Sequence, residues 1–266
     1  MSAVRAAPGG VSFVALDLGT ARTRSLCSAS PAIADRPSHL PSHLSARPPR
    51  SGQALRHGMV ADRGSCLELA RLVMREARLS GGWPVAHVVA GIPLAASSHD
   101  RRAVRESVGA AAGCPVTLIE EPLAAAAGAG LDLADPRPRL LLDVGAGIVE
   151  AVTLRGGAIE DATALQLAAT TSAGLVSYAQ DSVVAMTAAL LHRLSGRARA
   201  TAREAGLVVT GGGAHESALV TRLSTALRMP VRAAPEPQHA TIRGLLRLSL
   251  TTGLPGTEVS PEGRAR

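Results

Sequence analysis

The spacing of hydrophobic residues changes repeatedly along the chain, and each change predicts a new strand or helix. Val11–Leu16 is a mostly apolar run that predicts a buried strand, and Thr23–Ser28 follows as its return strand. Val85–Ala90 and Leu140–Leu142 are further apolar runs that predict strands. Between them, Ser98–Ala112 places arginines on one side and alanine and valine on the other, which predicts an amphipathic helix.

The rest of the chain continues this alternation of strands and helices. We predict further helices at 66–79, 123–129, 174–194, 216–227 and 241–250, and further strands at 116–119, 150–154, 207–210 and 231–233. Ser65 is expected to cap the first of these helices, and Pro122 to open the second. A polar, proline-rich stretch from about 30 to 53 and the tail from Thr251 predict loops without regular structure. The sequence therefore predicts an α/β fold.

The two halves of the chain begin in the same way, with a strand, an Asp-x-Gly turn and a second strand. The turns are Asp17-Leu18-Gly19-Thr20 and Asp143-Val144-Gly145-Ala146-Gly147. Glycines let backbone N–H groups approach phosphate oxygens, and successive turn amides form an anion-binding nest. The two aspartates would hold Mg²⁺ through its water ligands. A single turn of this kind is more often a plain strand connection, so the repetition carries the argument.

The formal net charge of +7 would suit a nucleic acid or an anionic membrane, but the composition argues against the former. All 28 basic residues are arginine, and lysine and asparagine are absent, as expected from a GC-rich genome. The arginines form no dense run interleaved with aromatic residues, so we predict no nucleic-acid partner. Three dispersed cysteines match no zinc or disulfide pattern, and residues 1–10 lack an apolar signal region. These features predict a soluble, cytoplasmic protein.

Several motifs occur in the order in which the MreB family of bacterial, rod shape-determining actin-like proteins carries them. Residues 17–23 resemble the first phosphate loop of that family, and residues 142–147 resemble the second. Residues 118–126 look like the helix that connects the two lobes, and residues 209–214 resemble the adenosine motif. The resemblance extends from about 58 to 154 and again from about 177 to 250, and it identifies the chain as a shortened, divergent MreB/Mbl-type protein.

The resemblance implies an actin-like (ribonuclease H-like), two-lobed ATPase fold whose small upper subdomains are reduced or missing. The first lobe is expected to comprise residues 1–128, with a loop at about 29–53 in place of its small subdomain. Residues from about 239 to 266 are expected to complete that lobe. The second lobe is expected at 129–238 without its upper subdomain, because only residues 155–206 separate its second hairpin from the adenosine motif.

The resemblance also implies ATP and Mg²⁺ as cofactors and assigns roles to individual residues. Glu121 matches the carboxylate that orients or deprotonates the attacking water. Without the resemblance, it would read as an acid that stabilises a helix N-terminus. Asp17 and Asp143 match the magnesium side of the cleft. The residues that match the nucleotide and phosphate contacts are Gly19, Thr20, Ala21, Thr23, Gly145, Ala146, Gly147, Gly211, Gly212, Gly213 and Ala214.

Departures from the family pattern lower the expected activity. The second phosphate loop continues with Ile148-Val149 where the family has threonines, so a hydroxyl that helps to place the catalytic water is missing. Arg22 stands where the family carries asparagine, and it would crowd the phosphate or contact it. Together with the lost upper subdomains, these changes predict weak nucleotide binding with impaired hydrolysis and polymerisation. The alternative is a nucleotide-independent scaffold or regulator that acts through protein contacts.

The family's membrane contact and partners complete the expectations. Leu79 and Trp83 lie in a loop that can dip into the inner leaflet in the family, and Arg71, Arg75 and Arg78 are close by in sequence. A tryptophan that covers the core of the lobe is the equally weighted alternative. The partners that the resemblance implies are the chain itself or a full-length relative, together with proteins of cell shape and wall synthesis. A peripheral place at the inner face of the plasma membrane would follow.

Overall fold

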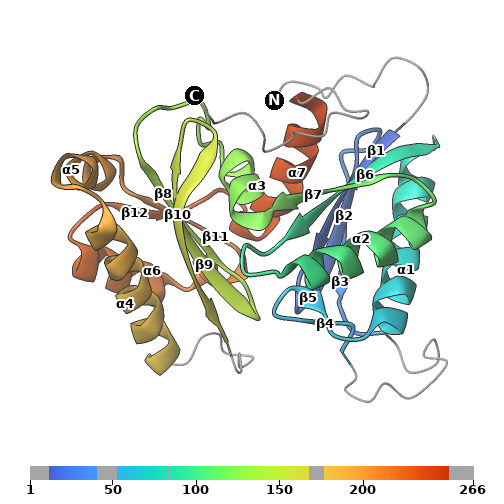
Figure 1. Ribbon diagram of the computed structural model, residues 1–266, viewed down its shortest axis with the longest axis horizontal. Helices are drawn as coiled ribbons and strands as arrows, with labels where there is room; N and C mark the ends of the chain where they lie inside the picture. The colour runs from blue at the N-terminus through green and yellow to red at the C-terminus, as the bar shows by residue number, and fades with distance from the viewer. Residues whose placement is uncertain (1–11, 41–52, 83, 168–176, 252–266) are drawn as a thin grey trace.

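Two five-stranded sheets form the frame of the protein. The computed structural model describes residues 12–40, 53–82, 84–167 and 177–251. The strand order is β3-β2-β1-β6-β7 in the first sheet and β10-β9-β8-β11-β12 in the second (Figure 1). Each sheet therefore combines an antiparallel three-stranded meander with two parallel strands, and the two halves of the chain share one plan.

The first sheet carries the first Asp-x-Gly turn at the end of its central strand. Its strands are β1 (Ser12–Leu18), β2 (Arg22–Cys27), β3 (Ile33–Pro37), β6 (Val85–Ile92) and β7 (Val116–Glu120). The helices α1 (Arg63–Gly81) and α2 (Ser98–Ala112) share one hydrophobic cluster with it, which includes Val14 and Leu16. Ala15 points to the opposite face and packs against α7 (Ala240–Thr251), so both faces of β1 are covered. A small hairpin, β4 (Leu55–Arg56) and β5 (Met59–Val60), precedes α1.

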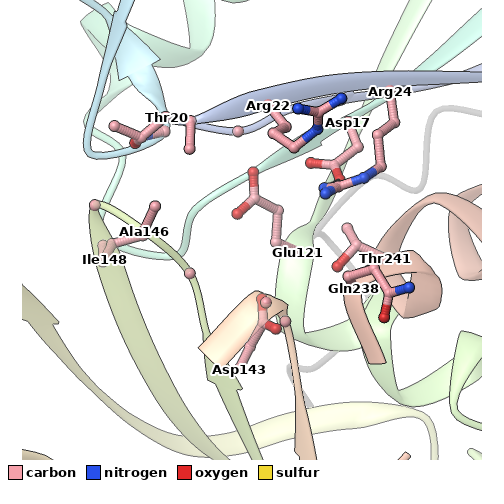
Figure 2. Close-up of a pocket in the computed structure, with 17 residues that line it drawn as sticks. Asp17, Thr20, Arg22, Arg24, Glu121, Asp143, Ala146, Ile148, Gln238 and Thr241 are labelled. Carbon is pink, nitrogen blue, oxygen red and sulfur yellow. Dashed lines mark hydrogen bonds and ion pairs between the residues drawn. The ribbon is translucent and has the colours of Figure 1, made fainter. Parts of the chain in front are cut away.

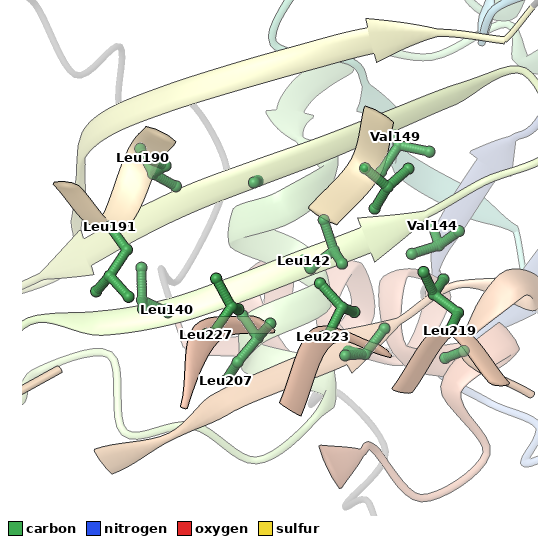
Figure 3. Packing of buried hydrophobic residues seen from close by; sticks show 14 of the residues in the cluster. Leu140, Leu142, Val144, Val149, Leu190, Leu191, Leu207, Leu219, Leu223 and Leu227 are labelled. Atoms are coloured by element: carbon green, nitrogen blue, oxygen red, sulfur yellow. The ribbon is translucent and has the colours of Figure 1, made fainter. Parts of the chain in front are cut away.

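The second sheet repeats the arrangement with its own core. Its strands are β8 (Arg139–Val144), β9 (Ile148–Arg155), β10 (Ala158–Gln166), β11 (Leu207–Thr210) and β12 (Val231–Ala233). The helices α4 (Ser177–Arg193), α5 (Gly196–Ala205) and α6 (Ser217–Leu227) cover one face. Leucines of β8 and α6 interdigitate there, as Leu142 and Leu223 illustrate (Figure 3). This tight apolar packing fixes the end of β8, where the second Asp-x-Gly turn begins.

The helices α3 (Glu121–Gly128) and α7 pack against each other between the two sheets (Figure 1). Their backbones approach so closely that a Cβ on Gly128 would lie 1.7 Å from the carbonyl oxygen of Ala240. A Cβ on Gly244 would lie 1.7 Å from the carbonyl oxygen of Ala124. Ala124 belongs to the cluster under the first sheet, and Ala125 to the cluster under the second. The close contact between α3 and α7 therefore lies where the cores of the two sheets meet.

Replacing Gly244 by alanine is expected to lower the free energy of unfolding by about 1–3 kcal/mol, because the new methyl group forces two helix backbones apart. Gly109→Ala in α2 is the control, since a Cβ there meets only Val116 Cγ2 at an ordinary 3.8 Å. That control is expected to be neutral or to gain about 0.5–1 kcal/mol from helix propensity. Denaturant unfolding of both variants measures the difference, and equal stabilities would contradict the close contact.

The structure corrects the expected loop at about 30–53. Residues 33–37 form the edge strand β3, which pairs antiparallel with β2. Asp35 stabilises this strand through ion pairs with Arg22 and Arg24 of β2. These ion pairs connect side chains of the neighbouring strands β2 and β3. The polar residues that suggested a loop therefore form contacts that hold the edge strand in the sheet. Residues 41–52 lie outside the described ranges.

Other expected elements also need correction at their edges. Asp62, and not Ser65, caps α1: its Oδ1 accepts the N–H of Ser65 at 2.8 Å. The structure adds β10 and α5, for which no element was predicted. The strand β10 lies at a sheet edge with mixed exposed and half-buried positions, which hides its apolar pattern. Of the long helix expected at 174–194, α4 covers 177–193, and 174–176 lie outside the described residues.

The connections that follow β3 and β10 are short. Residues 38–54 join β3 to β4, and residues 167–176 join β10 to α4. Segments of these lengths are well below the size of an independently folding subdomain.

Candidate functional site

One cavity of about 180 Å³ lies where the two sheets face each other, and both Asp-x-Gly turns line it (Figure 2). Its wall includes eight of the predicted nucleotide-binding residues: Gly19, Thr20, Ala21, Gly145, Ala146, Gly147, Gly211 and Gly212. The predicted acidic residues Asp17, Glu121 and Asp143 line it as well. The structure thus brings together residues from both halves of the chain.

Glycine is required in both turns because a carbonyl oxygen occupies the space of a side chain. A Cβ on Gly19 would lie 2.7 Å from the carbonyl oxygen of Arg22, and one on Gly145 would lie 2.8 Å from that of Ile148. In the second turn, the Gly145 N–H donates to the Ile148 carbonyl at 3.0 Å. In both turns the backbone therefore approaches so closely that only glycine fits. Successive amides in such turns can form an anion-binding nest.

The tips of the two turns touch at one end of the cavity. A Cβ on Gly147 would lie only 2.3 Å from Thr20 Oγ1, so this hydroxyl rests against the second turn. Thr20 Oγ1 in turn accepts the Gly58 N–H at 2.8 Å. His57 Nδ1 lies 2.7 Å from the carbonyl oxygen of Gly147. These contacts join the halves of the chain and close that end of the cavity.

Three buried carboxyl groups, those of Asp17, Glu121 and Asp143, converge on the cavity. Burial raises the pKa of each one, that of Asp143 to about 6 and that of Glu121 well above its usual value. Asp17 and Asp143 raise the pKa of Glu121 further by charge repulsion. Thr210 Oγ1 lies 2.8 Å from Asp143 Oδ1 and orients that carboxyl group.

This acidic set fits a hydrated Mg²⁺. Glu121 Oε1 is buried and has no hydrogen-bond partner among the described residues. Within the described part of the chain, no three His, Cys, Asp or Glu side chains are grouped to hold a metal ion directly. Mg²⁺ normally keeps several waters and needs only one or two carboxylates, so Asp17 and Asp143 suffice as water-mediated ligands.

Arg24 is a cavity residue that the sequence did not reveal. Its Nη1 lies 3.2 Å from Asp17 Oδ2, and its Nε lies 3.1 Å from Asp35 Oδ2. Arg22, which was expected to crowd or contact the phosphate, lines the cavity but directs its Nε to Asp35 Oδ1 at 2.6 Å. Because side chains alternate along a strand, Arg22 and Arg24 lie on the same face of β2. This alternation in the sequence could have indicated that Arg24 lies near the cavity together with Arg22.

Glu150 is a second residue that the sequence reading missed. It is buried in β9, and its Oε1 accepts the N–H of Leu94 at 2.8 Å. Leu94 follows β6 of the first sheet, so this hydrogen bond joins the two sheets. Burial raises the pKa of Glu150 to about 7, and repulsion from Asp143 adds to the shift. A lone acid within an apolar strand was the signal that could have identified it.

The C-terminal segment supplies the remaining wall. Gln238 and Thr241 line the cavity next to Gly211 and Gly212. Gln238 Oε1 lies 2.7 Å from His215 Nε2. The short 3-10 helix Pro237–His239 and the start of α7 position both residues, so the C-terminal segment reaches the cavity. The sequence reading assigned no role to either residue.

Three predicted nucleotide contacts lie outside the cavity wall. Thr23 is buried behind the first turn, where its Oγ1 lies 2.9 Å from Ser38 Oγ. Gly213 backs onto Val144, since a Cβ there would lie 2.3 Å from Val144 Cγ1. Ala214 is buried in the core of the second sheet. These three residues therefore pack behind the residues that line the cavity and do not line it themselves.

Comparison with known proteins gives the family. The model of the MreB/Mbl protein family matches residues 50–180. The cell shape-determining protein MreB of Escherichia coli strain K12 is 39% identical over 71 residues, which cover 27% of this chain and 20% of that protein. The cell shape-determining protein MreB of Pasteurella multocida is 31% identical over 112 residues, covering 41% and 32%.

Solved structures show that the fold is shared with known actin-like proteins. MreB5 of Spiroplasma citri bound to ADP superimposes with a TM-score of 0.77 at 16% identity, covering 91% of this chain and 97% of that one. The MamK double helical filament gives 0.73 at 17% identity, covering 92% and 100%. The chain is an MreB-type actin-like protein. Its α/β architecture is the actin-like ATPase fold, as the sequence predicted.

The alignments of this MreB-type chain span between 20% and 32% of the length of these two curated relatives. Of its predicted membrane residues, Leu79 is 77% exposed, and Trp83 lies outside the described residues. No helix in the described part of the chain is long and apolar enough to cross a bilayer.

Proposed function

We propose that this MreB-type chain binds ATP with Mg²⁺ in the cavity between its two sheets. The observation that carries the proposal is the convergence of both glycine turns, three buried carboxyl groups and Gly211-Gly212 on one cavity. Solved relatives of the same fold are described as bound to ADP and to AMPPNP, which supports the choice of ligand.

The geometry suggests a role for each part of the wall. The N–H groups of the two turns hold the phosphates, and Asp17 and Asp143 hold Mg²⁺ through water. Gly211 and Gly212, with Gln238 and Thr241 beside them, would face the sugar and base. Glu121 orients or deprotonates the attacking water, and its raised pKa suits a group that accepts a proton.

Weak hydrolysis belongs to the same proposal. Ile148 lines the cavity directly after the second turn, at the position where the family pattern has threonine. An apolar side chain there offers no hydroxyl to hold the attacking water, so turnover is expected to be slow even when ATP binds.

The two-lobe division also stands as a proposal. We take residues 1–128 with about 239–266 as the first lobe and 129–238 as the second, both with reduced upper subdomains. The packing of α7 against β1, β2 and β6 supports the assignment of the C-terminal segment to the first lobe. The short connections 38–54 and 167–176 support the reduction.

At the level of the cell, we propose a role in the cytoskeleton that determines cell shape and guides wall synthesis. The chain would associate with itself or with a full-length MreB-like relative, and its polymerisation would be impaired by the short connections. A cytoplasmic location, with peripheral contact at the inner leaflet through Leu79 and Trp83, completes this proposal. The exposure of Leu79 supports such a contact.

A nucleotide-independent scaffold is the second candidate, and the size of the cavity favours it. A volume of about 180 Å³ is below the roughly 300–1,000 Å³ of typical ligand sites. The contact of Thr20 with Gly147 closes one end of this space, so the turns must separate to admit a triphosphate.

Titration calorimetry with Mg-ATP decides between the two candidates. The wild-type chain is expected to bind with micromolar affinity, and Asp143→Ala is expected to lose at least about tenfold because a magnesium-side carboxylate is gone. Glu106→Ala is the matched control, since that side chain is exposed and pairs with Arg63 on the surface. Absence of heat with the folded wild-type chain would leave the scaffold as the function.

A further inference from the structure

A pair of polar side chains, Gln238 and His215, lies at the C-terminal wall of the cavity. Gln238 lines the cavity, and its Oε1 lies 2.7 Å from His215 Nε2. The carbonyl oxygen of a glutamine side chain accepts hydrogen bonds and cannot donate them, so the His215 Nε2–H is the donor. His215 itself does not line the cavity. The pair therefore has a fixed direction, in which a residue behind the wall holds the amide oxygen of Gln238.

The amide nitrogen of Gln238 is the part of the side chain that is still without a partner. Among the described residues, no acceptor contacts its Nε2. An amide nitrogen carries two N–H donors and no acceptor. Because the amide oxygen is held by His215, the amide cannot turn over without losing that hydrogen bond. Gln238 therefore presents N–H donors at the cavity wall.

The backbone that carries Gln238 is held from both sheets. The Gly211 N–H of the second sheet's glycine turn donates to the carbonyl oxygen of Pro237 at 2.9 Å. On the other side, His239 Nε2 lies 4.0 Å from Asp35 Oδ2 of the first sheet. A side chain whose backbone and amide oxygen are both fixed loses little further freedom when a ligand binds. Gln238 is therefore positioned before a ligand arrives.

Gln238 lies at the end of the cavity that a base would occupy. In Figure 2, Glu121 lies between the turn tips, marked by Thr20 and Ala146, and Gln238. With the phosphates at the turns, the part of a nucleotide that reaches Gln238 is the end remote from the phosphates, which is the base. Gly212 leaves room for a flat ring there, because a Cβ on it would meet nothing within 4 Å.

We propose that Gln238, oriented by His215, is a specificity residue that donates a hydrogen bond to a ring nitrogen of a purine base. The inference rests on the proposed nucleotide binding and names the contact through which that site recognises the base. The unsubstituted ring nitrogens of adenine accept hydrogen bonds and do not donate them, which matches the donor that Gln238 presents. His215 is a positioning residue, because it acts through Gln238.

Titration calorimetry of the full chain with Mg-ATP and with Mg-tripolyphosphate tests the inference. Gln238→Leu keeps the approximate size of the side chain and removes the donor. It is expected to bind ATP about threefold to tenfold more weakly, as for the loss of one neutral hydrogen bond. Tripolyphosphate has no base, so its dissociation constant is expected to be unchanged in the variant. His215→Leu should show a smaller loss for ATP and none for tripolyphosphate.

Deaza analogues of ATP, in which a C–H group replaces one ring nitrogen, identify the acceptor. Of the analogues that lack N1, N3 or N7, one is expected to bind the wild-type chain about threefold to tenfold more weakly than ATP. Gln238→Leu is expected to bind that analogue and ATP equally, because the donor is missing. His215→Leu should discriminate between them less than the wild-type chain does, which a general loss of stability would not produce.

Gln53→Leu is the matched control, because Gln53 is exposed and does not line the cavity. It is expected to bind every probe like the wild-type chain, and circular dichroism verifies that each variant is folded.

Three results would overturn the inference while leaving nucleotide binding intact. They are a Gln238→Leu variant that binds ATP like the wild-type chain, equal losses of ATP and tripolyphosphate binding in that variant, and a wild-type chain that binds all three deaza analogues as well as ATP. A folded wild-type chain that binds neither ATP nor tripolyphosphate would contradict both this inference and the proposed function.

Discussion

Gly211→Ala is expected to lower the free energy of unfolding by about 2–5 kcal/mol. Gly211 has a φ of +80°, a region that side chains rarely adopt. A Cβ there would also lie 2.4 Å from the carbonyl oxygen of Val144 and 2.8 Å from Asp143 Oδ1. A backbone shift that relieved these contacts would weaken the hydrogen bond from the Gly211 N–H to the carbonyl oxygen of Pro237, which is 2.9 Å long. The substitution therefore strains the link between the second sheet and the C-terminal segment.

The next residue provides the control. Gly212 also lines the cavity, but a Cβ on it would meet nothing within 4 Å. Gly212→Ala is expected to keep the stability of the wild-type chain within about 1 kcal/mol. Urea unfolding followed by circular dichroism measures both variants. Similar losses for the two alanine variants would mean that flexibility of the glycine pair, and not the contact at Gly211, sets the stability here.

Local pattern was enough to predict much of the fold. The structure has α2, β11 and β12 with the bounds that the sequence indicated. For α2 the reason lies in its ends, since Ser97 and Asp100 form a reciprocal cap and Gly113 ends the helix in a left-handed conformation. Such signals act within a few residues, so one sequence suffices to detect them.

What could not be predicted depends on register between distant segments. The row formed by Asp17, Arg24 and Asp35 exists only because three strands align at those positions. The contact of Glu150 with Leu94 joins residues that are 56 positions apart. The turn motifs could be located from glycine and aspartate spacing, whereas the charged groups between them could be assigned only from the assembled sheets.

Glu150→Gln is expected to change how stability depends on pH. In the folded chain the pKa of Glu150 is raised to about 7, against 4.5 for the free side chain, because its carboxyl group is buried. Between these values the folded state holds a proton that the unfolded state has released. Stability therefore falls as pH rises from about 4.5 to about 7, and it stays low above that. The loss is on the order of a few kcal/mol at full ionisation.

Glutamine removes this penalty and keeps an oxygen that can accept the Leu94 N–H. The variant is therefore expected to match the wild-type chain near pH 5 and to be more stable near pH 8, as urea unfolding at the two pH values would measure. Asp143, with a pKa of about 6, retains part of the slope in the variant. Glu68→Gln on the exposed face of α1 should leave the wild-type slope unchanged. If Glu150→Gln destabilises the chain at pH 8, the ionised carboxylate instead stabilises the contact between the two sheets, and its charge is compensated by the Leu94 N–H.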